Sequence, residues 1–158
     1  MIAVTLYCVG NLKEKYWREA CGEYEKRLGR FCRFSCVELE EYRLPADPSP
    51  AQIEQGLAEE GRRILSRISP KETVAALCIE GKKLTSPQLA RLLEEQAMEG
   101  PLALAIGGSY GLSPQVKERA RLRLSMSDMT FPHQLSRVML LEQLYRGFMI
   151  QSGGKYHK

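Results

Sequence analysis

The sequence lacks the signals that mark secreted and membrane proteins. No apolar run approaches the ~18 residues needed to cross a bilayer, and the apolar opening MIAVTLYCV carries neither a basic segment nor a cleavage site. The five cysteines are odd in number and stand among apolar neighbours, unlike a disulfide framework. We therefore expect a cytoplasmic protein that does not enter a membrane and whose cysteines are mostly reduced core residues.

The motifs of common metal and nucleotide sites are also absent. Cys32 and Cys36 lack the paired Cys-x-x-Cys spacing of a structural zinc site, and the chain has only two histidines. The glycines of residues 107–111 do not form the G-x-G-x-x-G fingerprint, and no G-K-[ST] follows them. We expect no metal, and these motifs give little support to a bound dinucleotide or ATP.

The excess of positive charge is modest. The 23 Lys and Arg residues against 19 Asp and Glu give a net charge of +4, which permits a nucleic-acid partner without requiring one. A chain of 158 residues with 44% hydrophobic residues can bury one substantial core. No repeat, low-complexity tract or linker divides it, so we expect a single domain over residues 1–158.

Patterns typical of strands and helices alternate along the chain. Apolar runs predict strands at 2–9, 32–40, 73–79, 102–106 and 122–126. Helical spacing of apolar residues predicts helices over 16–28, 53–68 and 89–97, a short one at 114–121 and a last one at 134–151. Continuous apolar strands such as LALAI suit a parallel sheet covered on both faces. The predicted fold class is α/β, a parallel sheet between layers of helices.

A double glycine, Gly107–Gly108, follows the strand LALAI. In an open parallel sheet, ligands bind beyond the carboxyl ends of the strands. Glycine at such a place permits positive φ and lets a flat ligand approach the backbone. Glycine is also common in tight strand-to-helix turns. From these residues alone, a ligand site and a tight turn both stay open.

A loop of small polar residues and methionines, SMSDMTFPH, precedes the last predicted helix. Its backbone offers donors and acceptors for the edge of an adenine, and Met126, Met129 and Phe131 offer apolar surface for its faces. The alternative is that these three side chains plug the core beneath the helix. His133 falls close to the helix start, where a structural role is expected.

The last predicted helix is apolar on more than one side. Its main stripe is widened by Met139, Leu140, Met149 and Ile150. A helix at the end of a small domain can bury a second apolar side against another subunit, so we expect a homodimer. Glu142 and Arg146 stand four apart in the order that favours an intrahelical pair. Arg137 is either a contact to RNA phosphate or part of a solvated helix face.

The chain finishes with SGGKYHK. The Ser-Gly-Gly segment is a candidate hinge, and residues 155–158 then supply phosphate-binding charge, a stacking ring at Tyr156 and the titratable imidazole of His157. The alternative is a frayed terminus.

Several of these segments together closely resemble the RlmH family of SPOUT methyltransferases. They are VGNLKEKYWREACGEYEKRLGRF, IGGSYGLSP, LSMSDMTFPHQLSRVMLLEQLYRGF and the terminal YHK, which cover essentially the whole chain. The resemblance implies a C-terminal trefoil knot in the α/β fold, although threaded chains are rare. It also implies a homodimer that uses S-adenosylmethionine to methylate N3 of a pseudouridine in large-subunit (23S) ribosomal RNA.

The resemblance also assigns roles to residues. By position, the contacts to S-adenosylmethionine are Leu77, Gly107, Met126, Ser127, Asp128, Met129, Thr130 and Phe131. The chemistry needs alignment and removal of an imide proton, with no metal and no covalent nucleophile. His157 is the first candidate for the base or for RNA positioning, with Tyr156 beside it and Arg137 as an RNA contact. An oriented water is the alternative base.

The expected substrate is a folded surface. The chain has no appended RNA-binding domain and little excess charge, so we expect it to recognise the assembled ribosome rather than a short linear sequence. Two alternatives stay open: a ribosome-associated SPOUT-fold binding protein without catalysis, and a SPOUT methyltransferase that acts on another RNA.

Overall fold

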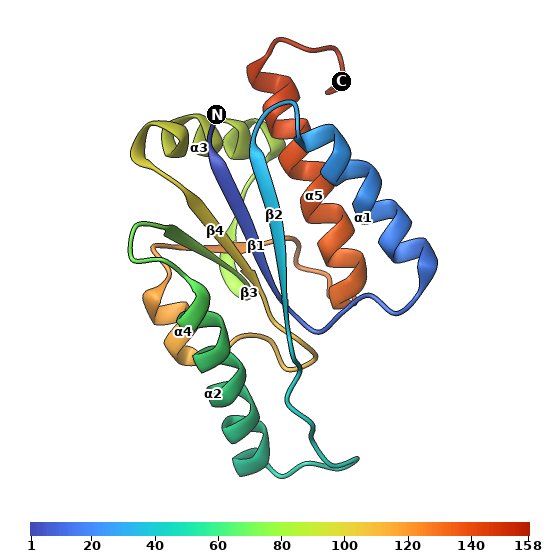
Figure 1. Cartoon of the computed structure of the whole chain (residues 1–158), viewed down its shortest axis with the longest axis vertical. Coiled ribbons are helices and arrows are strands. Elements are labelled where there is room, and N and C mark those ends of the chain that lie inside the picture. The colour runs from blue at the N-terminus through green and yellow to red at the C-terminus, as the bar shows by residue number, and fades with distance from the viewer.

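The fold is built on one five-stranded parallel sheet with the strand order β2-β1-β4-β3-β5 (Figure 1). The structure is a computed structural model that describes residues 1–158. The strands are β1 (Ala3–Val9), β2 (Arg33–Leu39), β3 (Thr73–Lys83), β4 (Leu102–Ile106) and β5 (Leu122–Ser125). The helices are α1 (Lys15–Leu28), α2 (Pro50–Arg67), α3 (Ser86–Glu99), α4 (Pro114–Arg119) and α5 (His133–Gln151). The predicted α/β class and the alternation of elements are confirmed.

Helices cover both faces of the sheet, so successive strand residues enter two different cores. Leu6 and Leu104 lie in the larger core with α1, α3 and α5. Tyr7 and Ala105, the next residues along β1 and β4, lie in the smaller core with α2 and α4. All five residues of β4 are buried, as expected for a central strand. No helix is both long enough and apolar enough to span a bilayer.

Helix α5 packs between α1 and α3, and Figure 1 shows α1 and α5 side by side. Its buried apolar residues are Leu140, Leu141, Leu144 and Phe148. Gly147 permits the close approach of α3, because a Cβ there would lie 2.9 Å from Cδ1 of Leu93. Much of the wide apolar surface is therefore buried within the chain itself. Met139, Met149 and Ile150 stay partly exposed.

Strand β3 is longer than the predicted 73–79 because it contains a bulge. Leu124 of β5 lies level with Leu77 and again with Lys82, so residues 78–81 loop out between them. Gly81 makes this possible, since a Cβ there would lie 2.4 Å from the carbonyl carbon of Leu124. After the bulge β3 pairs with β5 again, as far as Lys83, which lies level with Ser125 at the end of β5. The trefoil knot implied by the resemblance stays a prediction.

Candidate functional site: a cleft at the strand ends

A cleft of about 700 Å³ lies at the carboxyl ends of β3, β4 and β5, and we call it the strand-end cleft. Its walls are three segments that are distant in sequence: residues 77–80 of the β3 bulge, residues 106–112 after β4, and residues 125–133 after β5. Lys117 and Ser136 complete the lining. The glycine turn and the polar loop therefore face one cavity, where an open parallel sheet binds ligands.

All eight residues that the resemblance assigns to the cofactor line this cleft. They are Leu77, Gly107, Met126, Ser127, Asp128, Met129, Thr130 and Phe131. That they contact S-adenosylmethionine stays a prediction, but they share one cavity although the first and the last, Leu77 and Phe131, are 54 positions apart in the sequence.

The glycine turn is tight. A Cβ on Gly107 would lie 2.1 Å from the carbonyl oxygen of Gly111, so no larger residue fits there without a backbone shift. The Gly111 amide donates to the carbonyl of Gly108 at 3.1 Å. Neither Gly107 nor Gly108 adopts the positive φ that glycine permits, and the positive φ of this turn, +81°, belongs to Gly111. The packing of this turn therefore explains the glycine at position 107, whether or not a ligand binds there.

Hydrogen bonds and one ion pair brace the loop after β5. The Ser125 hydroxyl donates to the carbonyl of Ser127 at 3.1 Å, and the Ser127 hydroxyl accepts from the Met129 amide at 3.0 Å. The Asp128 carboxylate lies 2.5 Å from the ammonium of Lys83 on β3. The loop is therefore fastened to the end of β3, where Lys83 lies level with Ser125.

The two methionines of this loop have different surroundings. Met126 packs against the larger core, so the alternative of a core plug fits it. Met129 is 71% exposed and lines the cleft, so a core plug does not describe it. Phe131 is partly buried on the same wall.

The bulge adds charged and thiol groups that the sequence analysis did not assign to the site. Glu80 and Lys117 form an ion pair at 2.6 Å across the cleft. The hydrogen bond from the Lys117 ammonium lowers the pKa of Glu80. Burial, then the charge of Glu80, raise the pKa of the Cys78 thiol, which keeps this cleft residue protonated at neutral pH. Cys78 and Glu80 become cleft residues through the bulge, which no local pattern indicates, and Lys117 reaches the cleft from α4.

Arg137 fits neither of its expected environments. Its side chain is 5% exposed, and Nη1 lies 2.8 Å from a carboxylate oxygen of Glu38 on β2. Nη2 donates to the carbonyl of Gly10 at 3.2 Å. A solvated helix face is therefore wrong, and the guanidinium is engaged inside the chain rather than open to RNA phosphate.

The C-terminal tail lies far from the cleft of its own chain. Helix α5 has 19 residues, so its ends are about 28 Å apart at 1.5 Å per residue. His133 at its start lines the cleft, whereas the tail follows its other end. Figure 1 shows the C-terminus at the same end of the molecule as the N-terminus, away from the carboxyl ends of the strands.

The tail folds back onto the C-terminal half of α5. Glu142 and Arg146 form the predicted ion pair, and the hydroxyl of Tyr156 donates to Glu142 at 3.2 Å. Arg146 lies over the Tyr156 ring, 4.6 Å from its centroid, and donates to Nδ1 of His157 at 3.4 Å. Burial, then the charge of Glu142, raise the pKa of Tyr156 to about 12. Its phenol is therefore a hydrogen-bond donor at neutral pH, not a base.

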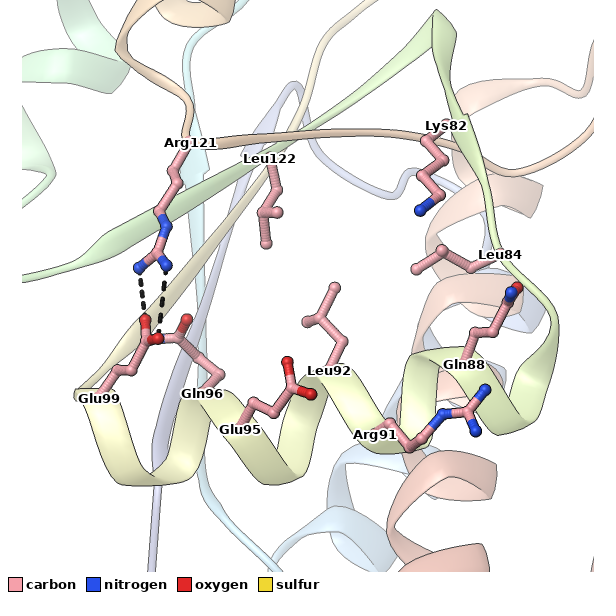
Figure 2. Close-up of a pocket in the computed structure, with 10 residues that line it drawn as sticks. All are labelled: Lys82, Leu84, Gln88, Arg91, Leu92, Glu95, Gln96, Glu99, Arg121 and Leu122. Carbon is pink, nitrogen blue, oxygen red and sulfur yellow. Dashed lines mark hydrogen bonds and ion pairs between the residues drawn. The ribbon is translucent and has the colours of Figure 1, made fainter.

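A second, smaller hollow of about 260 Å³ lies between α3 and the β3–β5 edge of the sheet (Figure 2). Three leucines point into it, and one end is closed by the ion pair of Arg121 with Glu99. None of the predicted site residues lines it. No group of three or more His, Cys, Asp or Glu side chains anywhere in the structure is arranged to hold a metal ion. The strand-end cleft is therefore the candidate site.

A parallel α/β sheet with a cleft at the carboxyl ends of its strands defines the class of α/β ligand-binding proteins. Within that class, the family model described as "Predicted SPOUT methyltransferase" matches residues 2–157. The chain belongs to the SPOUT methyltransferase family, which confirms the resemblance found in the sequence.

Relatives match the chain over nearly its full length. A Streptococcus thermophilus (strain CNRZ 1066) protein named "Ribosomal RNA large subunit methyltransferase H" is 48% identical over 157 residues, covering 98% of this chain and 99% of its own. A Ligilactobacillus salivarius (strain UCC118) protein of the same name is 49% identical over 152 residues, covering 95% and 96%. Among solved structures, a probable methylase family protein from Haemophilus influenzae Rd KW20 has a TM-score of 0.56 at 12% identity, covering 98% of this chain and 70% of its own, which supports the fold alone.

Proposed function

We propose that this chain is an S-adenosylmethionine-dependent methyltransferase of large-subunit ribosomal RNA, and that it methylates N3 of a pseudouridine in 23S RNA on the assembled ribosome. The observation that carries the proposal is the strand-end cleft, which all eight expected cofactor residues line. The names of the relatives that match almost the whole chain support the RNA substrate.

The cleft fits S-adenosylmethionine in size and chemistry. Its volume of about 700 Å³ lies within the range of small-molecule sites. The turn and loop present backbone groups and hydroxyls, Met126 and Phe131 present apolar surface, and Glu80 and Asp128 present carboxylates. When bound, S-adenosylmethionine supplies a methyl group already activated on a sulfonium, so no metal is required.

The residues of the chain would then align the reactants and handle one proton. The N3–H of the pseudouridine must lose its proton to a base as the nitrogen becomes the nucleophile. His157 remains our first candidate, with an oriented water as the alternative. Tyr156, which keeps its proton, is suited to donating a hydrogen bond or stacking on the RNA. The start of α5 lines the cleft, and the tail comes after the opposite end of this helix. The tail would therefore act in the cleft of a neighbouring subunit of a homodimer.

Two measurements test the proposal. Calorimetry without added metal should detect binding of S-adenosylmethionine and of its demethylated product. Labelled S-adenosylmethionine should then transfer its methyl group to ribosomes or large subunits from a strain that lacks the enzyme, and mapping should place the label on one pseudouridine. Absence of binding would favour the alternative of a binding protein without catalysis. Label in another RNA would favour the alternative substrate.

A further inference from the structure

Exposed apolar side chains gather at the mouth of the strand-end cleft. Of the six large hydrophobic residues that are well exposed in the chain, three line this cleft: Ile79 (80% exposed), Met129 (71%) and Tyr110 (51%). They come from three separate segments, the β3 bulge, the loop after β5 and the glycine turn. Water-exposed apolar groups that converge on one cavity mark a binding surface.

Tyr110 is the aromatic member of this group, and its ring has no partner in the chain. It makes no ring stack, cation–π contact or side-chain hydrogen bond, whereas Tyr7, Tyr145 and Tyr156 each make at least one. The ring is carried by the tight turn between Gly107 and Gly111, where backbone meets backbone. A ring without a partner, carried by a closely packed turn, is available to stack on a flat ligand.

Tyr110 also borders a second cleft, of about 850 Å³, which lies beside the first and shares Ser109 and Tyr110 with it. Its charged lining residues are the carboxylates Glu38, Glu40, Glu41 and Glu60 and the cations Lys13 and Arg43. Carboxylates repel phosphate but accept hydrogen bonds from the N–H groups of bases. Arg137 pairs with Glu38, whereas Glu40 and Glu41 make no ion pair, so their carboxylates can accept hydrogen bonds from a base on this side of Tyr110.

We propose that Tyr110 stacks on an unstacked base of the RNA substrate at the mouth of the strand-end cleft, with Ile79 and Met129 enclosing that base. This inference rests on the proposed function, because it names where the RNA is held beside the methyl donor. Enzymes that modify a base must take it out of its stack, and aromatic rings are the usual platforms for such bases. Tyr110 is then a positioning residue for the RNA and not a contact that sets cofactor affinity.

The test compares wild type, Tyr110→Phe, Tyr110→Ala and the control Tyr16→Ala, which removes a 62%-exposed tyrosine from α1, outside the cleft. Methyl transfer is measured against ribosome concentration, and S-adenosylmethionine binding by calorimetry. Tyr110→Ala should raise KM for the ribosome about tenfold, the order expected for one lost base–aromatic stack. It should change kcat and cofactor affinity little. Tyr110→Phe and Tyr16→Ala should behave like the wild type.

Each contrary outcome has a defined meaning. A Tyr110→Ala enzyme with wild-type KM overturns the inference while the proposed function stands. If Tyr110→Phe and Tyr110→Ala raise KM for the ribosome equally, the hydroxyl and not ring stacking holds the RNA. If Tyr110→Ala binds S-adenosylmethionine more weakly than the wild type, the ring contacts the cofactor instead of the RNA. Sedimentation of Tyr110→Ala as a smaller species than the wild type assigns the surface to a second copy of the chain. A wild type that transfers no methyl group to any ribosomal particle rejects the proposed function, and this inference with it.

Discussion

Two adjacent glycines in the turn after β4 have opposite structural requirements. A Cβ on Gly107 would lie 2.1 Å from a backbone oxygen, whereas a Cβ on Gly108 would have its nearest neighbours at 3.4 Å, on Glu41 and Val9. Gly107→Ala should therefore lower the free energy of unfolding by about 2 kcal/mol or more, and Gly108→Ala should change it little. Urea unfolding of the two variants measures the difference. Equal stability would mean that the turn shifts freely, and a larger residue at Gly107 would then report on ligand binding alone.

For single residues, the resemblance in the sequence predicted the residues of the cleft, whereas helical spacing did not predict which polar residues are buried. The eight expected cofactor residues line one cavity because strand ends of a parallel sheet meet at one edge. The solvated face considered for Arg137 is wrong because helical spacing does not show which polar residue faces inward, while its contact to RNA stays a prediction. Its partner Glu38 lies 99 positions away. Tyr110 lies in the segment IGGSYGLSP, but only the structure shows that its ring has no partner in the chain.

At the scale of elements, most strands and helices lie within a few residues of their predicted bounds. Apolar runs and helical spacing are local signals, so β4 and α5 could be found without knowing their neighbours. The extension of β3 to Lys83 could not, because it depends on pairing with β5 across the bulge at residues 78–81. Residues 80–83, EGKK, lie beyond the apolar run and carry no strand pattern of their own.

The ion pair of Glu38 with Arg137 connects β2 to the start of α5, next to the loop of the strand-end cleft. The Arg137 side chain is 5% exposed and the Glu38 side chain 43%. Glu38→Gln would leave the buried guanidinium of Arg137 without its carboxylate partner and should lower the free energy of unfolding by about 3 kcal/mol. Arg137→Met leaves a carboxylate that water reaches, so the loss should be smaller, about 1 kcal/mol. Denaturant titrations of both variants decide it, and the reverse order would contradict this account of the pair.

At the scale of the whole molecule, the cleft and the C-terminal tail of one chain lie apart, although the proposed reaction needs both. The strand-end cleft lies at the carboxyl ends of the strands, and the tail with Tyr156 and His157 packs on the C-terminal half of α5. Met139, Met149 and Ile150 leave apolar surface on α5 partly exposed. A homodimer joined through α5 would cover this surface and could bring the tail of one subunit to the cleft of the other.

Subunit mixing tests this arrangement directly. A chain lacking residues 155–158 has no tail, and Thr130→Trp should block the cleft, since Thr130 is exposed and lines it. Each variant alone should be inactive, although the truncated chain should still bind S-adenosylmethionine. After subunit exchange of an equal mixture, a heterodimer holds one open cleft facing one intact tail. Random pairing then gives about a quarter of wild-type methyl transfer. If the tail served the cleft of its own chain, no active site would form in any dimer and the mixture would stay inactive. A truncated chain with full activity by itself would show that the tail is only a frayed end.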